Sequence, residues 1–592
     1  MNRKTGAEYF KDNKTRFCVW APFKKNVAVR LKDKKPIPLN KDKNGYWEGL
    51  VNDTGPGDLY KFIIDEEHEF PDPASRSQPE GVHSWSQIVD PNFSWKDEDW
   101  SGLPISKMVI YELHVGTFTE GGTFEAVINK LDHLLDLGVN TIEIMPISQF
   151  PGDRNWGYDG VYPYAAQHSY GGSHGLKKMI DACHRKGIAV LLDAVYNHMG
   201  PEGNYLSQYG PYFTEKYQTP WGAAINFDDK HSDEVRNFFL QNALMWLEEF
   251  HFDGLRLDAI HEIIDRGARH LLKEMSQKVD ELEEKTGRTY VLIAESDLND
   301  TKVVNTYAKG GFGLEGQWVD DFHHAVHTLL TGEKDGYYSD YGKITQLAKS
   351  FKQGFIYDGI YSTHRKRTIG NSPKDLPLYH FVVSIQNHDQ VGNRMLGDRL
   401  PNLISFEALK LAAGVMLTSP FVPMLFMGEE FAEDNPFQYF VSHGDKDLVK
   451  AVQQGRMREF EYFLTHEGEF PDPQSRETFN NSKLNWKFNE DPTKKHVFKF
   501  YKYLLKLRGE GAFEAFRNNG IQTEGMEESN MLIVRSTGLF AVYNFSKEPQ
   551  DINLPEGEWN LLLASADKKW GGNDTYSSGD KVPGHSFILF KQ

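Results

Sequence analysis

The stretch His251-Phe252-Asp253-Gly254-Leu255-Arg256-Leu257-Asp258-Ala259-Ile260-His261 decides the fold. Residues 254–259 have the apolar character of a buried strand, and their two charged members stand two positions apart. Side chains on a strand alternate between its faces, so we expect Arg256 and Asp258 to project the same way. A guanidinium beside a carboxylate keeps it ionised, and such an anion at a strand end is a nucleophile for an electrophilic carbon. Taken alone, the motif also fits a structural ion pair.

The composition predicts a soluble, acidic, multidomain protein. The 592 residues carry a net charge of −18, with 39% hydrophobic and 25% charged residues. This acidity argues against nucleic acid or an anionic membrane as a partner, since both require a basic surface. No run approaches the roughly 18 apolar residues of a membrane span, and residues 1–17 lack the apolar core of a signal peptide. Two cysteines, Cys18 and Cys183, allow no disulfide framework, so we expect a cytoplasmic protein.

Residues 1–100 are expected to form a small β-sandwich. Short alternating runs at 16–22, 26–31, 46–51 and 58–64 are separated by turn-forming residues, which is typical of a sandwich. Four aromatic residues in these runs could form a sugar platform, but a core position is the better expectation: Trp20, Trp47, Tyr60 and Phe62.

Residues 101–512 predict a (β/α)8 TIM barrel, so the chain belongs to the α/β class. Eight strand-like apolar runs alternate with amphipathic segments, at 108–115, 141–147, 188–195, 254–259, 290–296, 313–318, 381–387 and 422–428. Helices are expected at 123–137, 175–186, 233–250 and 264–284. Two long connections, 200–230 and 330–378, are of the kind that shapes a binding cleft. Residues 513–592 return to short alternating runs and predict an antiparallel β domain that closes the far end of the barrel.

Acids and histidines follow several of the expected barrel strands. The third strand ends in Asp193-Ala194-Val195-Tyr196-Asn197-His198, the fourth at Asp258, the fifth at Glu295, and the seventh in Asn387-His388-Asp389. The chemistry of a barrel lies at these strand ends, and the cleavage of a sugar acetal requires carboxylates that face each other. The pattern therefore favours a glycoside-active enzyme.

The four stretches 193–198, 254–259, 294–295 and 387–389 resemble the signature regions of the α-amylase superfamily, glycoside hydrolase family 13. The resemblance implies retaining chemistry, with Asp258 as nucleophile, Glu295 as general acid/base and Asp389 as the stabiliser of the transition state. It also implies that Arg256 holds Asp258, that His198 and His388 bind sugar hydroxyls, and that Tyr158 stacks on the sugar ring. Packing within a turn is the alternative for Tyr158. The remaining substrate-binding residues that we expect are Asp193 and His261. The resemblance extends to residues 1–100, which are similar to the carbohydrate-binding-like module that precedes the barrel in branching and debranching members.

A finer resemblance covers nearly the whole chain. Residues 71–83, 317–324 and 386–394 resemble members of the superfamily that cut the α-1,4 bond beside the terminal trehalose unit of malto-oligosyltrehalose. It implies a glycosidase that releases trehalose and a malto-oligosaccharide, as part of trehalose biosynthesis. Phe431 and Ala432 depart from this pattern, where Trp-Gly is frequent, and could alter a cleft wall. A glycogen branching enzyme and a non-catalytic glucan-binding protein are the alternatives.

We expect no metal and no cofactor. His323, His324 and His327 have helical spacing beside two aspartates, but a helix whose polar groups pair with one another explains them better than zinc. No dense Asp/Asn cluster marks a calcium site in the connection after the third strand. The expected partners are malto-oligosyltrehalose and related α-glucans, and the chain is expected to be a monomer or a homodimer.

Overall fold

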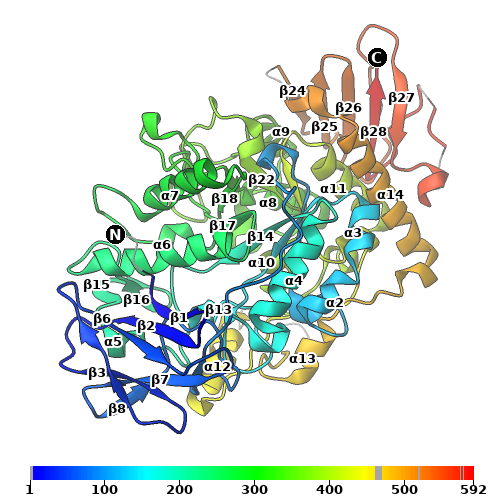
Figure 1. The fold of residues 1–592 in the computed structure, drawn as a ribbon. Helices are drawn as coiled ribbons and strands as arrows, with labels where there is room; N and C mark the ends of the chain where they lie inside the picture. Colours follow the sequence, from blue (N-terminus) through cyan, green and yellow to red (C-terminus); the bar gives the residue numbers. More distant parts are fainter. Residues whose placement is uncertain (1–3, 461–469, 518–519, 574, 578) are drawn as a thin grey trace.

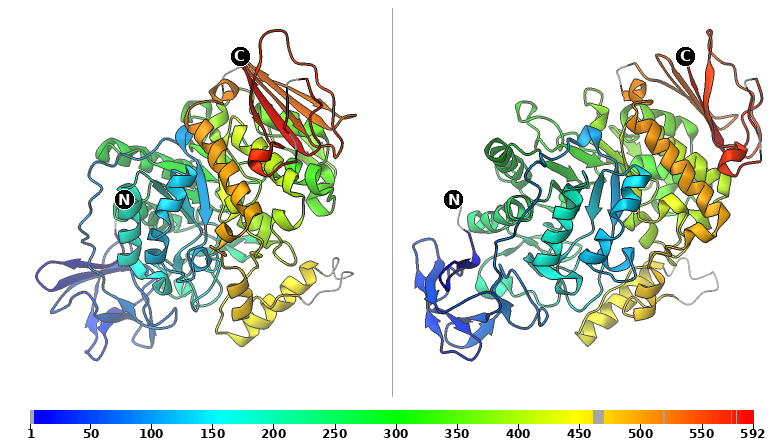
Figure 2. Two further views of the ribbon diagram at one scale, coloured as in Figure 1. Left: turned by 90° about the vertical axis from the view of Figure 1, so that its right-hand side faces the viewer. Right: turned by 45° about the vertical axis from the view of Figure 1, so that its right-hand side comes forward.

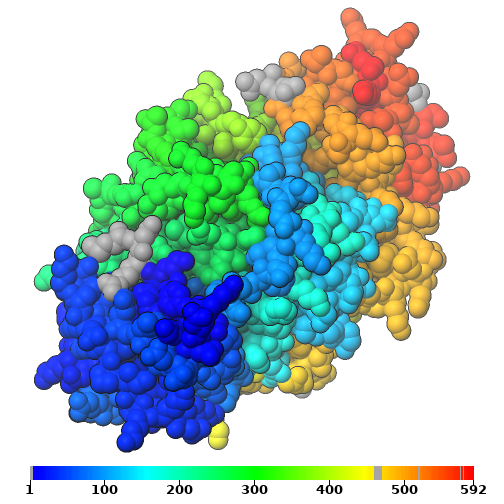
Figure 3. Space-filling view, viewed as in Figure 1, coloured from blue at the N-terminus to red at the C-terminus, as the bar shows by residue number. Residues whose placement is uncertain are grey.

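A closed barrel lies at the centre of the computed structural model, which describes residues 4–460, 470–517, 520–573, 575–577 and 579–592. The N-terminal strands and the C-terminal strands lie at opposite ends of the molecule (Figures 1 and 2). The space-filling view shows both end regions in contact with the central part (Figure 3). The expected domain boundaries at 100/101 and 512/513 stay predictions.

The barrel has eight parallel strands. Their bounds are β10 (Ile110–Leu113), β11 (Thr141–Ile144), β14 (Ala189–Ala194), β17 (Gly254–Leu257), β18 (Val291–Ala294), β19 (Gly316–Trp318), β22 (Phe381–Val383) and β23 (Val422–Phe426). Each strand lies within one of the eight apolar runs, so the predicted barrel is confirmed.

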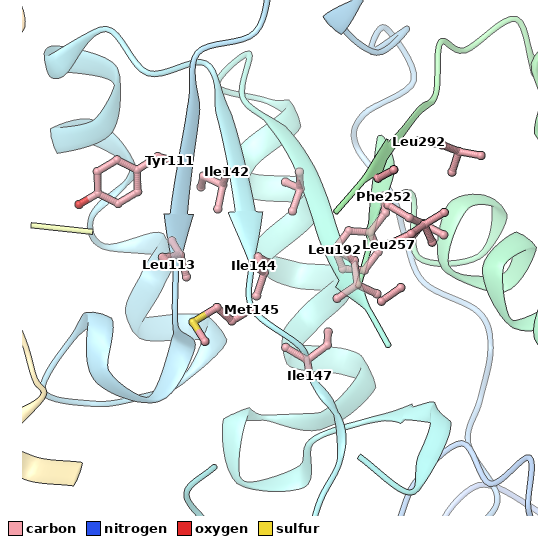
Figure 4. Packing of buried hydrophobic residues seen from close by; sticks show 14 of the residues in the cluster. Tyr111, Leu113, Ile142, Ile144, Met145, Ile147, Leu192, Phe252, Leu257 and Leu292 are labelled. Carbon is pink, nitrogen blue, oxygen red and sulfur yellow. The ribbon is translucent and has the colours of Figure 1, made fainter. Parts of the chain in front are cut away.

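Burial on both faces explains why these strands are continuous apolar runs. Leu191 and Leu192 are neighbours in β14, yet they belong to different buried clusters because side chains alternate across a strand. Leu191 packs with residues from β10, β18, β22 and β23, which identifies the cluster inside the barrel. Leu192 belongs to the larger cluster, together with Ile142 and Ile144 of β11 (Figure 4).

Helices form the outer ring of the barrel, and two of them differ from the expectation. The ring includes α4 (Gly172–His184), α6 (Ser232–Glu248), α7 (Leu271–Thr286), α8 (Asp320–Thr331) and α11 (Phe406–Thr418). The helix expected at 123–137 is divided into α2 (Phe124–Ile128) and α3 (Leu131–Leu137). The helix expected from residue 264 begins only at Leu271, because the Asp265 carboxylate accepts the backbone N–H groups of Gly267 and Leu271 and holds a turn there.

The two long connections contain secondary structure of their own. The first, after β14, contains α5 (Leu206–Tyr209) and the hairpin β15 (Phe213–Thr219) and β16 (Gly222–Ile225). The second, before β22, contains α9 (Ile344–Gln353) and the hairpin β20 (Ile360–Ser362) and β21 (Arg367–Ile369). Both connections are thus ordered extensions of the barrel.

The N-terminal strands form two sheets, in the orders β1-β2-β6-β5 and β4-β3-β7-β8, with β9 paired to β7. Their bounds are β1 (Gly6–Phe10), β2 (Lys14–Trp20), β3 (Val27–Leu31), β4 (Ile37–Pro38), β5 (Asn40–Lys41), β6 (Tyr46–Asn52), β7 (Leu59–Ile64), β8 (His68–Phe70) and β9 (Ser86–Gln87). The four aromatic residues considered as a sugar platform are all buried, so their core position is confirmed. Cys18 and Cys183 are buried and form no disulfide.

A short segment of the N-terminal module, residues 80–84, is fixed to the barrel. Val82 packs in a buried cluster with Val161, Tyr162 and Ala165, and its carbonyl accepts a 2.6 Å hydrogen bond from the Tyr162 hydroxyl. Gly203 approaches so closely that a Cβ there would lie 2.5 Å from Val82 Cγ2. The module is therefore packed directly against the barrel.

The C-terminal sheet has the antiparallel order β24-β25-β26-β28-β27. The strands are β24 (Gln522–Met526), β25 (Met531–Ser536), β26 (Leu539–Asn544), β27 (Asn560–Ala564) and β28 (Ser586–Lys591). Gly525 of β24 meets Thr345 of α9, and Gly414 of α11 meets Phe587 of β28. The sheet thus rests on α9 and α11. Within the described ranges, no helix combines the length and apolarity needed to cross a bilayer.

Candidate active site

The expected polar residues meet at the carboxyl ends of the barrel strands. Asp193 lies in β14 and is in register with Arg256 of β17. Leu257 of β17 is in register with Ala294 of β18, so Asp258 and Glu295 follow neighbouring strands at the same level. Asp389 lies in α10 (His388–Gly392), which follows β22. Because the strands are parallel, all these ends share one rim of the barrel.

Arg256 is fully buried and joins two carboxylates. Its Nη1 donates to both oxygens of Asp193, at 2.7 and 2.8 Å, and to Asp258 Oδ1 at 2.7 Å. The guanidinium lies over the Trp318 ring, 4.3 Å from its centroid, which adds a cation–π attraction. The predicted pairing of Arg256 with Asp258 is confirmed. Burial raises the pKa of Asp193 to about 6, so that this carboxyl is still ionised at neutral pH.

Asn197 holds the second oxygen of Asp258. Its Nδ2 donates to Asp258 Oδ2 at 2.7 Å and to the Asp258 carbonyl at 3.0 Å. Both carboxylate oxygens thus accept a hydrogen bond from a nitrogen donor, which suits the ionised form because that form is an acceptor only. The role of Asn197 was not foreseen, although it lies inside the quoted stretch 193–198.

Glu295 lies in a different environment. Its Oε2 accepts a 2.5 Å hydrogen bond from the backbone N–H of Ala259 and lies 3.8 Å from Arg256 Nη2. Ala259 makes this contact from a left-handed conformation, at φ 39° and ψ 54°. Burial raises the pKa of Glu295 to about 8, against the opposing effect of Arg256. The negative charges of Asp258, Asp320 and Asp389 raise it further. Glu295 is therefore protonated at neutral pH.

His388 links the barrel interior to the rim. Its Nδ1 lies 2.5 Å from Glu112 Oε1, and its backbone N–H donates to Glu112 Oε2 at 3.0 Å. Its Nε2 lies 2.7 Å from the Tyr158 hydroxyl and 3.4 Å from Asp389 Oδ2. Burial opposes a charge on His388, but Asp389 and Glu112 outweigh it and raise its pKa to about 9. His388 is thus a cation at neutral pH.

Tyr158 and His198 complete the network. The Tyr158 hydroxyl donates to Asp193 at 2.6 Å, and its ring stacks on His388 with centroids 5.2 Å apart. His198 Nε2 contacts the Tyr158 carbonyl at 3.0 Å, and its ring stacks on Trp221 of the hairpin after β14. Burial lowers the pKa of His198. Both aromatic groups are held by polar contacts as well as by packing.

His261 is not brought into this network. It lies in the short helix after β17, and no hydrogen bond or ion pair joins it to the carboxylates within the described part of the chain. Its Nδ1 is buried without a hydrogen-bond partner.

Four further residues of the site were not predicted: Glu112, Trp221, Trp318 and Asp320. Glu112 carried a usable signal, because it is an acid within the apolar run of the first barrel strand. Asp320 begins α8 directly after β19, and burial, together with Asp389, raises its pKa to about 7. Trp221 and Trp318 are recognisable only from their contacts with His198 and Arg256.

Phe431, where the chain departs from the related pattern, lies inside the protein. It is fully buried and stacks on Phe488 at 4.7 Å, beside Trp486. The preceding Glu430 contacts the Tyr111 hydroxyl and His133. The departure therefore changes an aromatic core cluster, and we find no contact of Phe431 with the carboxylates among the described residues.

No group of three or more His, Cys, Asp or Glu side chains arranged to hold a metal ion occurs in the described ranges. His323, His324 and His327 are buried in α8, where His323 contacts His324 at 3.1 Å and His327 contacts Glu333 at 2.8 Å. These contacts fit the structural explanation.

Comparison with known proteins agrees with this geometry. Residues 70–221 match the model of the alpha amylase catalytic domain, and residues 4–92 match carbohydrate-binding module 48, the isoamylase N-terminal domain. A crystal structure from Salmonella typhimurium, whose name places it provisionally among the alpha amylases, has a TM-score of 0.91 and 37% identity, with all of both chains covered.

Two curated relatives span almost the full length. The malto-oligosyltrehalose trehalohydrolase of Saccharolobus solfataricus is 50% identical, over 97% of this chain and 98% of its own. The malto-oligosyltrehalose trehalohydrolase of Arthrobacter ramosus is 41% identical, over 97% and 99%. The chain therefore belongs to the malto-oligosyltrehalose trehalohydrolase family of the α-amylase superfamily.

Proposed function

We propose that this protein is a retaining glycosidase that hydrolyses the α-1,4 bond beside the terminal trehalose unit of malto-oligosyltrehalose. The observation that carries the mechanism is the contrast between two neighbouring carboxyl groups. Asp258 accepts hydrogen bonds on both oxygens, whereas Glu295, whose side chain is 16% exposed, has a pKa raised to about 8. A nucleophile and a general acid require this division.

In the first step, an Asp258 oxygen attacks the anomeric carbon and the glycosidic C–O bond breaks. Glu295 transfers its proton to the departing oxygen, so that trehalose leaves as a neutral molecule. Because Ala259 N–H occupies Glu295 Oε2, the proton to be transferred is carried by Oε1. Asp258 then carries the malto-oligosaccharide as a glycosyl ester.

In the second step, water attacks the same carbon and the ester bond to Asp258 breaks. Glu295, now ionised, accepts the proton of the water. Two displacements at one carbon restore the α configuration of the product. Asp389 is proposed to bind hydroxyls of the distorted sugar, and the positive charge on His388 is proposed to hold Asp389 in place.

Tyr158, His198 and Asp193 are proposed to bind the same sugar unit, with Tyr158 against its ring. The contacts of these three side chains with one another and with Arg256 support this role. His261 is retained only as a weak candidate, since none of these contacts reaches it.

A branching enzyme, which transfers the glycosyl group to another glucan, is the alternative within the superfamily. The names of the two full-length relatives favour the hydrolase. Incubation with malto-oligosyltrehalose and, separately, with amylose decides the question. Free trehalose supports hydrolysis, new α-1,6 branches support transfer, and binding without any product would support a glucan-binding protein.

Glu295→Gln tests the assignment of the two carboxyl groups. The variant cannot protonate a sugar leaving group, but it can still react with an α-maltosyl fluoride, because fluoride needs little protonation. Its second step lacks a base, so a glycosyl adduct on Asp258 is expected to accumulate and to be located by peptide mass spectrometry. Asp258→Asn is the matched control and should form no adduct. Normal turnover of malto-oligosyltrehalose by Glu295→Gln would show that the general acid is another residue.

We further propose that the reaction serves trehalose biosynthesis in the cytoplasm. Two cysteines that remain unoxidised and buried fit a reducing compartment. We also propose that the chain is a monomer or a homodimer, two states that a measurement of its mass in solution distinguishes.

A further inference from the structure

We propose that the groove between the N-terminal module and the barrel rim is a distal binding site for the glucan chain of the substrate. This inference rests on the proposed function. The groove encloses a cavity of about 490 Å³, within the range of about 300–1,000 Å³ typical of small-ligand sites. It is lined by Lys61, Glu80, His83 and Ser84 of the module, and by Glu202 and His443 of the barrel.

The groove lies next to the proposed catalytic residues. Segment 156–160 connects the two, since Tyr158 contacts Asp193 and His388 while the adjacent Asp159 lies 3.7 Å from His443 Nε2. The groove therefore borders the site through one turn of the chain.

The groove also lies on the side where the glucan chain is expected. Its barrel wall comes from the connections after β11, β14 and β23, whereas Glu295 and Asp320 follow β18 and β19, across the barrel. Glu295 protonates the departing oxygen, so trehalose lies on the same side of the scissile bond as Glu295. The glucosyl units that stay on Asp258 then extend away from Glu295, toward the groove.

The module wall of the groove is rigid. Val82, in the middle of segment 80–84, is buried in the barrel and bonded to Tyr162. His83 Nδ1 contacts the Tyr205 hydroxyl at 2.7 Å, and its Nε2 lies 3.3 Å from Glu202. Both walls are thus in place before a ligand binds, which lowers the entropy lost on binding.

The lining chemistry fits an uncharged polyol. One cation, Lys61, is accompanied by two carboxylates, Glu80 and Glu202, and by the hydroxyls of Ser84 and Ser442. An anion would be repelled by the carboxylates, and the overall charge of −18 disfavours it further. Mixed donors and acceptors are what sugar hydroxyls require, because each hydroxyl both donates and accepts.

His443 is held in place at the back of the groove. Only 1% of its side chain is exposed, and its Nδ1 and Nε2 lie 3.3 Å from Glu202 and 3.7 Å from Asp159. Glu202 also contacts His83 of the module at 3.3 Å, so this carboxylate joins the two walls of the groove.

The test uses malto-oligosyltrehaloses with one to five glucosyl units added to trehalose, and the full-length protein. Lys61→Ala removes a donor, Ser84→Trp fills the groove, and Lys35→Ala, an exposed lysine of the module outside the groove, is the control. We expect KM for the longest substrate to rise about five- to tenfold in the first two variants. A rise of this size corresponds to the loss of one or two hydrogen bonds. KM for the shortest substrate and kcat should stay as in the unchanged protein.

Equal loss for all chain lengths, or no loss for any, would overturn the proposal. Titration calorimetry of maltohexaose, with Asp258→Asn as the parent protein, separates this result from a failure of the proposed function. If the unchanged protein releases no trehalose, the function is wrong, yet weaker maltohexaose binding by Ser84→Trp would still support the groove. Undiminished maltohexaose binding by that variant would exclude it.

Discussion

Asn197 and Arg256 divide the two oxygens of Asp258 between them. The carboxylate can then neither rotate about its last bond nor tilt without losing a hydrogen bond. Arg256 is in turn held by Asp193 and by the face of Trp318, so its position does not depend on the substrate. At the scale of single residues, the proposed nucleophile is positioned before substrate binds, which is the condition for an efficient attack.

Arg256→Lys is expected to lower kcat at least about a hundredfold, because a small displacement of the nucleophile has an effect of this order. A lysine ammonium cannot stack on Trp318 as the guanidinium does, and its shorter side chain cannot place a donor where Nη1 meets Asp193 and Asp258. Rates on malto-oligosyltrehalose, with circular dichroism as a check on folding, measure the effect. Arg16→Lys, at an ion pair on β2 of the N-terminal module, is the control and should keep its activity. Near-normal kcat in Arg256→Lys would contradict the positioning role.

The pH dependence of activity should follow Glu295. Its pKa of about 8 predicts that kcat/KM falls as the pH rises through about 8, because the general acid is lost. The negative charge of Asp320 helps to raise that pKa, so Asp320→Asn should move the alkaline fall to lower pH. Asp398→Asn, a control outside these charge contacts, should leave the profile in place. If the alkaline fall stays at the same pH in Asp320→Asn, Asp320 does not raise the pKa of Glu295.

At the scale of elements, the two ends of the barrel strands serve different purposes. The carboxyl ends carry the proposed catalytic groups, whereas the amino ends are tied to the connector that precedes β10. Asp97 of that connector contacts His184 and His251, each at 2.8 Å, and Trp100 donates to Asp253 at 2.6 Å. This division is typical of barrels, whose amino-end face is concerned with stability.

Asp97→Asn should destabilise the fold by about 3 kcal/mol, as breaking a buried ion pair does. Burial opposes the charge of His184, but Asp253 and Asp97 outweigh it and raise its pKa above 6.5. The contribution of His184 to stability is therefore complete below pH 6.5 and is lost as the pH rises through the raised pKa. Burial also opposes the charge of Asp97, but His184 and His251 outweigh it and hold its pKa below 3.8. The contribution of Asp97 to stability is therefore present above pH 3.8. The gap in melting temperature between the two proteins should therefore be largest near pH 5–6 and smaller at pH 9. A gap that is independent of pH would contradict the charge pairing.

The barrel elements were predictable because strands buried on both faces are continuous apolar runs, as residues 254–257 illustrate. Asp258 and Glu295 could be found because each follows such a run. Glu112 and His388 were harder to connect, since they lie 276 residues apart and only the closure of the barrel joins them. The late start of α7 depends on Asp265 and its turn, a local competition that apolar periodicity does not reveal. His261 is near Asp258 in sequence, yet it makes no hydrogen bond with the carboxylates among the described residues, so its role in substrate binding stays a prediction.

At the scale of the whole molecule, the module packs tightly against the barrel at segment 80–84. The contact at this segment depends on Gly203, which lacks the Cβ that would collide with Val82. Both walls of the proposed glucan groove meet at this contact, so its geometry should govern the binding of long substrates as well as stability.

Gly203→Ala should lower stability by about 2–3 kcal/mol, because it combines a left-handed φ of +83° with a collision against Val82. Gly222→Ala is the matched control, since its φ is +110° but no atom lies within 4 Å of the added methyl group. The difference between the two variants in urea unfolding measures the collision alone. If the two variants lose the same stability, the module moves away from the added methyl group without a free-energy cost and is not rigidly held.

Each of the two buried thiols can report the opening of the part of the protein in which it lies. Cys18 lies in β2 of the module and Cys183 in α4 of the barrel, and an alkylating reagent reaches either one only when the structure around it opens. Burial also raises the pKa of the Cys183 thiol, which slows its reaction further in the folded state. Brief alkylation at rising urea concentration, read by peptide mass spectrometry, thus follows the two parts separately in the unaltered chain. If segment 80–84 couples them, the two thiols will become labelled over the same urea range, and Gly203→Ala will make Cys18 react first.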